Sequence, residues 1–271
     1  MSKQKEVNMS TENKYGNFTW YSYESTNSKP ALEFYKSLLG WQILEEDMGA
    51  PEKLQMIKAD TLTFADVEPA PGMGRNRWST HVTVENVEAT CERVKRMGGK
   101  VTKAPYTIPQ VGRLAFVTDT FGSEIGIITP EKTESLNHSG MGEKEGQICW
   151  NELLVADPKA AVGFYSEVFG WKFEATDMGP MGSYYHLKAN GKGCGGIMKT
   201  PPGAENMANL WMPYLTVNDI VAKTKQAGTL GAKVIKPPTH IPDTGYFSVI
   251  QDPAKCVSYL FQYTGKETLK V

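Results

Sequence analysis

The sequence predicts an α+β protein built by tandem duplication, with two β-α-β-β-β units in each half. The main observation is an internal repeat: Phe34-Tyr35 followed by Gly40-Trp41 recurs 130 residues later as Phe164-Tyr165 followed by Gly170-Trp171. A second observation is that strand-like and helical patterns follow one another in the same order in both halves. Together these patterns indicate four related units in one chain.

Later in the two halves the repeat distance becomes 133 residues, as Thr83-Val84 and Thr216-Val217 show, so one loop of the second half is three residues longer. Between the halves lies a polar, charged and glycine-containing segment with almost nothing to bury, which is typical of a linker. We therefore expect a disordered N-terminal tail, a first domain, a linker and a second domain, at residues 1–16, 17–130, 131–146 and 147–265.

The first unit of each half is expected to begin with a strand, at residues 18–24 and 148–155. A short helix should follow. In the second half Asp157 is a natural N-cap, Pro158 suits the first helical turn and Gly170 ends the helix. Apolar side chains at helical spacing, from Ala161 to Phe169, give this helix one buried face.

Short alternating segments such as 184–189 then indicate hairpin strands. The order is repeated in the second unit of the first half. There, residues 81–84 read as a strand, Asn86 caps a helix that runs to Gly98, and further strands end at Ile127-Ile128.

The composition excludes some classes of function. With 29 basic and 30 acidic residues the formal net charge is −1, which provides no electrostatic attraction for nucleic acid or an anionic membrane. No apolar run is long enough for a membrane span, and the first residues contain no apolar signal core. The four cysteines are scattered, which fits a reducing compartment. We expect a cytoplasmic monomer or homodimer with a small-molecule ligand.

The residues that carry the repeat resemble those of a known superfamily. Its marks are the D-P-x-x-A-x-x-F-Y and F-G-W segments between Asp157 and Trp171, and the later G-x-x-x-x-x-x-D-P segment between Gly245 and Pro253. These marks are similar to those of the vicinal-oxygen-chelate proteins, which include glyoxalase I, extradiol dioxygenases and bleomycin-binding proteins. The resemblance implies that each half forms a cup-shaped mixed sheet, and hence two cups.

Metal-using members of this superfamily hold a divalent ion in the cup through His, Gln or Glu side chains of the first and last strands. The corresponding first-strand positions of this chain are Trp20, Ser79, Trp150 and Met212, and the late-strand positions are Gly126 and about Tyr259. Indole, thioether and glycine cannot supply the three N or O donors that such an ion needs. A shift of one or two residues in the late-strand register would bring in Glu124, but would not restore three ligands. We therefore predict no metal and no other cofactor, with a divalent ion as the alternative.

The cup-facing side chains are the candidate ligand-binding residues. In the first half these are Trp20, Ser79 and His81. In the second half they are Trp150, Glu152, His186, Met212, Tyr214, Tyr246 and Tyr259. The second set is aromatic with few polar groups, which is typical of a pocket for a flat organic molecule.

Each candidate also has a structural interpretation. His81 and His186 can be hydrogen-bonded strand residues, since neither is repeated in the other half. Glu152 can be a general base, with His186 as its partner, or a carboxylate bonded to Tyr214. Trp20 and Trp150 can line the cups or fill them as core.

The leading hypothesis is a metal-independent protein that binds a small aromatic metabolite or drug. The rival is an enzyme, either a metal-dependent glyoxalase-like lyase or isomerase or dioxygenase, or a metal-free catalyst that uses Glu152 and His186. A third possibility is that both cups are filled and the protein acts through its surface.

Overall fold

The computed structural model describes residues 15–47, 53–70, 76–132 and 140–264. The predicted N-terminal tail, residues 1–16, lies almost entirely outside the described residues, as does the middle of the predicted linker. Within the described residues no helix is both long and apolar enough to span a membrane.

The first half forms one mixed sheet of eight strands in the order β2-β3-β4-β1-β5-β8-β7-β6. Its elements are β1 (Phe18–Ser25), α1 (Lys29–Leu39), β2 (Gln42–Glu46), β3 (Leu54–Ala59), β4 (Leu62–Pro69), β5 (Arg77–Thr83), α2 (Val87–Arg96), β6 (Lys100–Ile108), β7 (Gly112–Thr118) and β8 (Glu124–Pro130). Strands β1 and β5 pair antiparallel in the middle of this sheet, whereas β1 with β4 and β5 with β8 are parallel pairs.

The second half repeats this arrangement in the order β10-β11-β12-β9-β13-β16-β15-β14. Its elements are β9 (Ile148–Val155), α3 (Pro158–Phe169), β10 (Lys172–Asp177), the 3-10 turn η2 (Gly179–Met181), β11 (Ser183–Ala189), β12 (Lys192–Lys199), η3 (Glu205–Met207), β13 (Trp211–Thr216), α4 (Ile220–Thr229), β14 (Lys233–Ile241), β15 (Gly245–Gln251) and β16 (Val257–Tyr263). The predicted duplication of two β-α-β-β-β units is therefore confirmed.

The helix boundaries follow the sequence signals. The Asp157 side chain accepts a hydrogen bond from the backbone N–H of Ala160 at 3.1 Å, and Gly170 ends α3 in the left-handed region with φ of 73°. Asn86 caps α2 in the same way, through the N–H of Ala89. This helix ends at Arg96, slightly before the expected Gly98.

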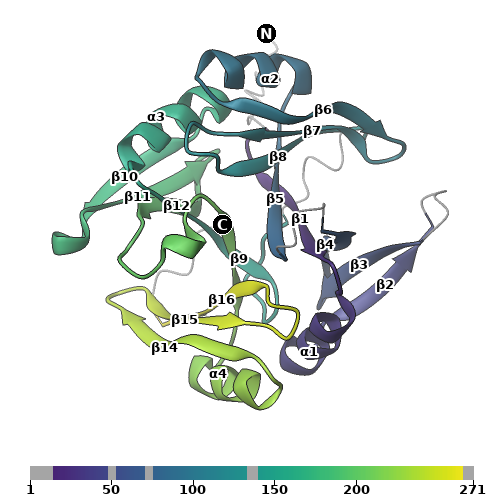
Figure 1. Ribbon diagram of the computed structural model, residues 1–271, viewed down its shortest axis with the longest axis vertical. Helices are drawn as coiled ribbons and strands as arrows, with labels where there is room; N and C mark the ends of the chain where they lie inside the picture. The colour runs from purple at the N-terminus through teal and green to yellow at the C-terminus, as the bar shows by residue number, and fades with distance from the viewer. Residues whose placement is uncertain (1–14, 48–52, 71–75, 133–139, 265–271) are drawn as a thin grey trace, which may run out of the picture.

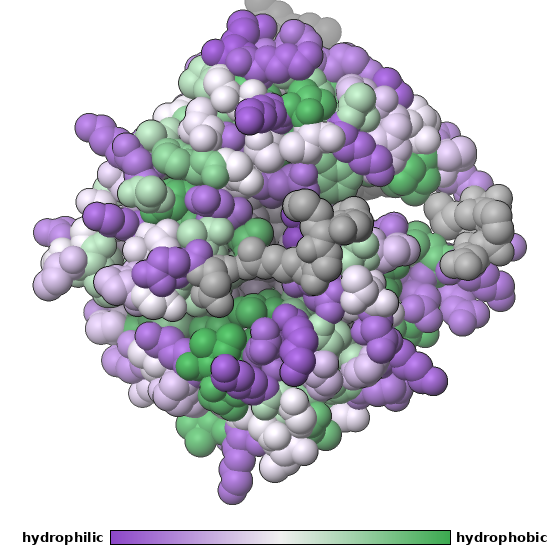
Figure 2. All heavy atoms as spheres, in the orientation of Figure 1, coloured by the Kyte–Doolittle hydropathy of each residue, from purple (hydrophilic) through white to green (hydrophobic). Residues whose placement is uncertain are grey.

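The helices lie where the two halves adjoin, with α1 against α4 and α2 against α3 (Figure 1). The polar outer surface of α2 forms the hydrophilic top of the space-filling view (Figure 2). Between the sheets lies one continuous apolar core to which both halves contribute, including Tyr21, Tyr23, Trp78, Tyr165 and Trp211. The faces of the sheets that meet here are thus closed to solvent.

Two buried aspartates join the halves in a reciprocal way. Asp252 of the second half accepts hydrogen bonds from the hydroxyls of Tyr23 and Tyr35 at 2.7 and 3.2 Å. Asp119 of the first half accepts one from Tyr165 at 3.0 Å. Because Tyr165 is the repeat counterpart of Tyr35, the tyrosine of the F-Y pair in each half bonds to the opposite half.

The indoles of the G-W pairs make a second set of long-range bonds. Trp41 donates to the carbonyl of Gly146 at 2.9 Å, and Trp171 donates to that of Gly16 at 2.7 Å. Gly146 lies in the described part of the predicted linker, residues 140–146. This part is packed rather than loose, because Gly140 is buried and its N–H donates to the carbonyl of Phe18.

Replacing Tyr35 by Phe tests how much the Asp–Tyr contacts stabilise the protein. The change removes the hydroxyl that bonds to Asp252 and to Ser258, and we expect the free energy of unfolding to fall by about 1–3 kcal/mol. Urea denaturation measures this loss. The control is Tyr185→Phe on β11, where no hydrogen bond of the hydroxyl is found among the described residues; equal stability of the two variants would contradict the prediction.

Candidate functional site

The face of each sheet opposite the shared core is the candidate site. We call these faces the first cup, which carries Trp20, Ser22, Asp66, Ser79 and His81, and the second cup, which carries Trp150, Glu152, His186, Met212 and Tyr214. Side chains alternate between the two faces of a strand, so the buried core residues Tyr21 and Tyr23 assign their β1 neighbours to the cup.

The second cup is filled by its own apolar cluster. Its buried members are Cys149, Leu154, Ala204, Met207, Met212, Tyr214, Val249, Tyr259 and Phe261. Met207 comes from η3 rather than from the sheet, and its sulfur lies 3.4 Å from the hydroxyl of Tyr259. In Figure 2 hydrophobic side chains lie over part of the β15 and β16 region, next to hydrophilic ones. Three of the predicted binding residues, Met212, Tyr214 and Tyr259, are thus buried against one another rather than exposed.

Glu152 is buried in this cup with both carboxylate oxygens occupied. One oxygen accepts a hydrogen bond from the Tyr214 hydroxyl at 2.8 Å, and the other accepts one from Tyr184 at 3.1 Å. The Trp150 indole donates in turn to the Tyr184 oxygen at 2.8 Å. Burial raises the pKa of Glu152, while the two tyrosine hydroxyls act in the opposite direction. The bonded, structural interpretation of Glu152 describes this geometry.

A glycine allows this network to form. Tyr184 crosses over Gly196 on the neighbouring strand β12, and a side chain at position 196 would collide with the tyrosine hydroxyl. His186 lies on the same row of the sheet as Gly196 and Glu152, half-buried, with its ring 4.8 Å from that of Tyr184. Burial lowers the pKa of His186. Tyr184, which the sequence analysis did not single out as a binding residue, therefore separates His186 from Glu152.

Tyr246 does not belong to the second cup. Its ring packs against the shared core and lies 4.8 Å from that of His240, on the face of β15 opposite the cup. Phe247 takes the cup-facing place, stacked with Tyr259 at 6.4 Å. Side chains alternate along a strand, and Val249 belongs to the cup cluster, so Phe247 faces the cup and Tyr246 faces the other side.

The first cup has a different character. Its predicted residues Ser79 and His81 are buried, and Trp20 is half-buried. The His81 ring lies over Gly126 of β8, where a side chain would collide with it, and beside Phe116 at 5.3 Å. Burial lowers the pKa of His81 to about 4, so the imidazole is neutral at physiological pH. Its Nδ1 has no hydrogen-bond partner within the described residues.

Asp66 on β4 is a site residue that the sequence analysis missed. Asp66 pairs in register with Ser22, and the counterpart of Ser22 in the second half is Glu152. The buried carboxyl group of the first cup is therefore on β4, whereas that of the second cup is on β9, the equivalent of the neighbouring strand β1. Burial raises the pKa of Asp66 to about 7, although hydrogen bonding by Ser22 and Trp20 opposes this shift. Its Oδ1 is buried without a partner among the described residues. The repeat of 130 residues aligns Asp66 with Gly196, and this change from glycine to an acidic residue is the sequence signal that could have identified Asp66.

An arginine joins two further acids at the edge of this cup. Arg77 donates from Nε to Glu24 at 2.6 Å and from a terminal nitrogen to Glu124 at 2.5 Å. The other Glu124 oxygen accepts from Thr102 at 2.6 Å. Glu124 is thus fully engaged by protein groups.

The residues present do not fit the divalent ion that the superfamily implies. In the sequence, Trp20 was compared with Ser79, and Trp150 with Met212, as first-strand positions. In the sheets Ser79 pairs with Ser22 and Met212 pairs with Glu152, so each compared pair lies in two different rows. The observed register places Trp20 beside His81 and Trp150 beside Tyr214, and neither pair supplies the donors that a divalent ion needs. Among the described residues no three His, Cys, Asp or Glu side chains come together in a way that could hold a metal ion.

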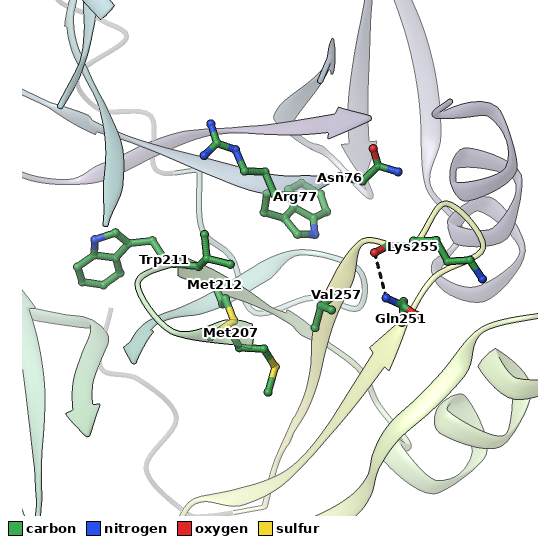
Figure 3. A pocket seen from close by; sticks show the side chains of 10 residues that line it. Asn76, Arg77, Met207, Trp211, Met212, Gln251, Lys255 and Val257 are labelled. Atoms are coloured by element: carbon green, nitrogen blue, oxygen red, sulfur yellow. Dashed lines mark hydrogen bonds between the residues drawn. The ribbon is translucent and has the colours of Figure 1, made fainter. Parts of the chain in front are cut away.

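A separate hollow of about 270 Å³ lies between the halves, next to the second cup. Met207, Met212 and Val257 lie together on one side of it, with Arg77 and Asn76 across from them (Figure 3). Of the buried polar atoms that lack a partner among the described residues, none lines this hollow. The first cup is therefore the stronger candidate for ligand recognition.

Glu152→Gln tests the structural interpretation of the second cup. An amide cannot accept two strong hydrogen bonds as a carboxylate does, so we expect a loss of about 1–2 kcal/mol in the free energy of unfolding. Thermal and urea denaturation measure it, with Glu174→Gln, on the exposed surface of β10, as the control. An unchanged stability combined with loss of a biochemical activity would instead favour a catalytic Glu152.

Asp66→Asn tests the pKa of the first-cup carboxyl. The pKa of Asp66 is about 7 in the folded protein and about 3.9 in the unfolded chain, so the folded state favours the protonated carboxyl group. Its contribution to the free energy of unfolding is complete below pH 4 and is lost as pH rises through 7. Between these values the wild type should lose up to about 4 kcal/mol relative to the Asn variant. Melting temperatures of both proteins measured from pH 4 to pH 8 check this, and parallel curves would refute it.

Comparisons with known proteins agree with this architecture. The family model described as the Glyoxalase/Bleomycin resistance protein/Dioxygenase superfamily matches residues 25–127 and 147–256. The CFP32 protein of Mycobacterium tuberculosis, which carries the provisional name of a glyoxylase, is 31% identical over 90% of this chain and 93% of its own. The anthracycline biosynthesis protein DauV of Streptomyces sp. strain C5 is 29% identical over 82% of this chain and 85% of its own.

Solved structures show the same fold at low identity. The 2,2',3-trihydroxybiphenyl 1,2-dioxygenase of Sphingomonas wittichii matches with a TM-score of 0.63 and 14% identity, covering 92% of this chain and 90% of that one. The Mn(II)-bound glyoxalase of Novosphingobium aromaticivorans matches with a TM-score of 0.60 and 16% identity, covering 94% and 86%. With the family model matched in both halves, this chain belongs to the glyoxalase/bleomycin resistance protein/dioxygenase superfamily.

Proposed function

We propose that this protein binds a small, flat organic molecule in the first cup without the help of a metal ion. The observation that carries the proposal is a pair of buried polar atoms, Asp66 Oδ1 and His81 Nδ1, that have no partner within the described residues. Leaving such a group unsatisfied costs about 1–3 kcal/mol, and a ligand that bonds to it recovers this energy.

The surroundings of these atoms suit a flat molecule. Trp20 is the register neighbour of His81, and Phe116 contacts the His81 ring from the other side. Aromatic walls with a few oriented polar groups are typical of small-molecule sites, because the rings supply contact area and the polar groups fix the ligand's orientation.

The second cup supports the choice by contrast. Its carboxylate is bonded to two tyrosines, and Met207 closes over Tyr259. A ligand there would have to displace packed side chains and break hydrogen bonds that already exist. The two cups therefore differ in what they offer, although the sheets that form them are repeats.

The relatives provide independent support for an aromatic ligand. DauV is named for anthracycline biosynthesis, and anthracyclines are flat polycyclic aromatic compounds. The dioxygenase of similar fold is named for a trihydroxybiphenyl, also an aromatic molecule.

Metal independence is tested on protein treated with a chelator. Screening a library of aromatic compounds by thermal shift should identify ligands, and one present at a hundred times its Kd should add about 2.7 kcal/mol of stability. The shift should vanish in His81→Leu, which removes the unpartnered nitrogen, and should persist in the second-cup control Met212→Leu.

Two results would oppose this proposal. A shift that appears only after Zn²⁺, Ni²⁺, Mn²⁺ or Fe²⁺ is restored would show that binding depends on a metal. A shift that is lost in Met212→Leu and kept in His81→Leu would place the ligand in the second cup.

A further inference from the structure

The first cup carries more acidic than basic side chains close to its two unpartnered atoms. Five carboxyl groups and three cations lie on the cup face of these strands: Glu24, Glu46, Asp66, Glu68 and Glu124 against Lys58, Arg77 and Lys103. Glu68 shares a face of β4 with Asp66, because its register partner Glu24 lies two residues after Ser22. Lys103 shares a row with Phe116, and through Gly126 with His81.

The pairing of these charges leaves an excess of acid on one wall. Arg77 is hydrogen-bonded to both Glu24 and Glu124, so two of the acids share this single cation. The remaining cations of the cup are Lys58, on the neighbouring strand β3, and Lys103, which approaches from β6. Burial raises the pKa of Glu68, with Lys103 lowering it and Glu24 raising it further. Strand β4 thus carries two acids and no cation of its own, and the acids of the cup outnumber its cations.

We propose that the ligand of the first cup is a flat organic cation, an aromatic or heteroaromatic compound whose protonated nitrogen lies against Asp66 and Glu68. This inference rests on the proposed function and specifies its ligand. The charged nitrogen donates to the free Asp66 Oδ1, while the ring system lies against Trp20 and Phe116.

The opposite wall already shows how this cup holds an ammonium group. The Lys103 Nζ lies 3.9 Å from the centre of the Tyr106 ring and 5.6 Å from that of Phe116. Such contacts arise because the face of an aromatic ring carries partial negative charge. The Lys103 ammonium group already uses the faces of these two rings, so the ligand's own charge is placed at the acidic β4 wall instead.

His81 adds a hydrogen bond that selects for an N–H group. Its side chain is 4% exposed, and burial keeps the imidazole neutral, so Nδ1 accepts a hydrogen bond when the ring proton is on Nε2. Asp66 in its ionised form and His81 in its neutral form are both acceptors. An N–H donor of the ligand can satisfy either atom.

Binding should strengthen as Asp66 loses its proton. Glu68 titrates in the same direction, whereas His81 stays neutral above its pKa of about 4. The other charged groups facing this wall from β1, β2, β3, β5, β6 and β8 are Glu24, Glu46, Lys58, Arg77, Lys103 and Glu124. From pH 5 to pH 8 a cation should therefore bind about tenfold more tightly or better.

The test uses three compounds with one skeleton and different charge: benzamidine, benzamide and benzoate. Binding to the full chain is followed by NMR, through the indole N–H signal of Trp20 assigned with a Trp20→Phe variant. We expect benzamidine to bind at least tenfold more tightly than benzamide, and benzoate not to bind. Asp66→Asn should remove this preference and the pH dependence, whereas the distant Glu174→Gln should change neither.

The outcomes separate this inference from the proposed function. If benzamide or benzoate binds in the cup as tightly as benzamidine and Asp66→Asn has no effect, the ligand is not a cation, while binding in the first cup stands. If none of the three compounds perturbs Trp20, the inference fails, and the wider aromatic library decides the proposed function. If Mn²⁺ or Ca²⁺ alone shifts the Trp20 signal and competes with benzamidine, the acidic wall serves a metal ion and the inference is overturned.

Discussion

The buried hydrogen bonds between aspartates and tyrosines of opposite halves are the constraint on which the rest of the structure depends. Asp252 holds Tyr23 and Tyr35, and Asp119 holds Tyr165, in an interior where an unpaired carboxylate would be very costly. Burial raises the pKa of Asp252, which shows how strongly the surroundings disfavour its charge. The residues that mark the superfamily in this chain therefore fix how the halves pack, and they leave the cups free to vary.

The two cups have used this freedom differently. In the second, Glu152 is tied to Tyr214 and Tyr184 within a cluster of methionine and aromatic side chains. In the first, the carboxyl group stands on the adjacent strand as Asp66, with one oxygen unpaired among the described residues. A glycine in each cup, Gly126 or Gly196, provides the space over which a neighbouring ring lies. The same backbone thus supports one cup whose carboxylate is fully hydrogen-bonded and one whose carboxyl group keeps an oxygen without a partner among the described residues.

The sequence was sufficient to predict the fold, and only part of the candidate site. The helix caps at Asp157 and Asn86 and the strand periodicity depend only on neighbouring residues, and the repeat is visible when the two halves of the sequence are compared. A single sequence therefore contains all of these signals. Side-chain placement within a cup depends on register between strands that are distant in sequence. That is why Tyr246 was placed on the wrong face of β15, and why Asp66 escaped notice on a strand whose counterpart position is a glycine.

The near-symmetry of the contacts between halves has an evolutionary consequence. Each half presents both an aspartate and an aromatic partner, so two copies of one ancestral half could have closed the same surface reciprocally, as an isologous pair does. In such an assembly every mutation appears in both sites at once. A single chain is free of that restriction. Leu153 stands at the repeat position of Tyr23, so the contacts between the halves are unequal.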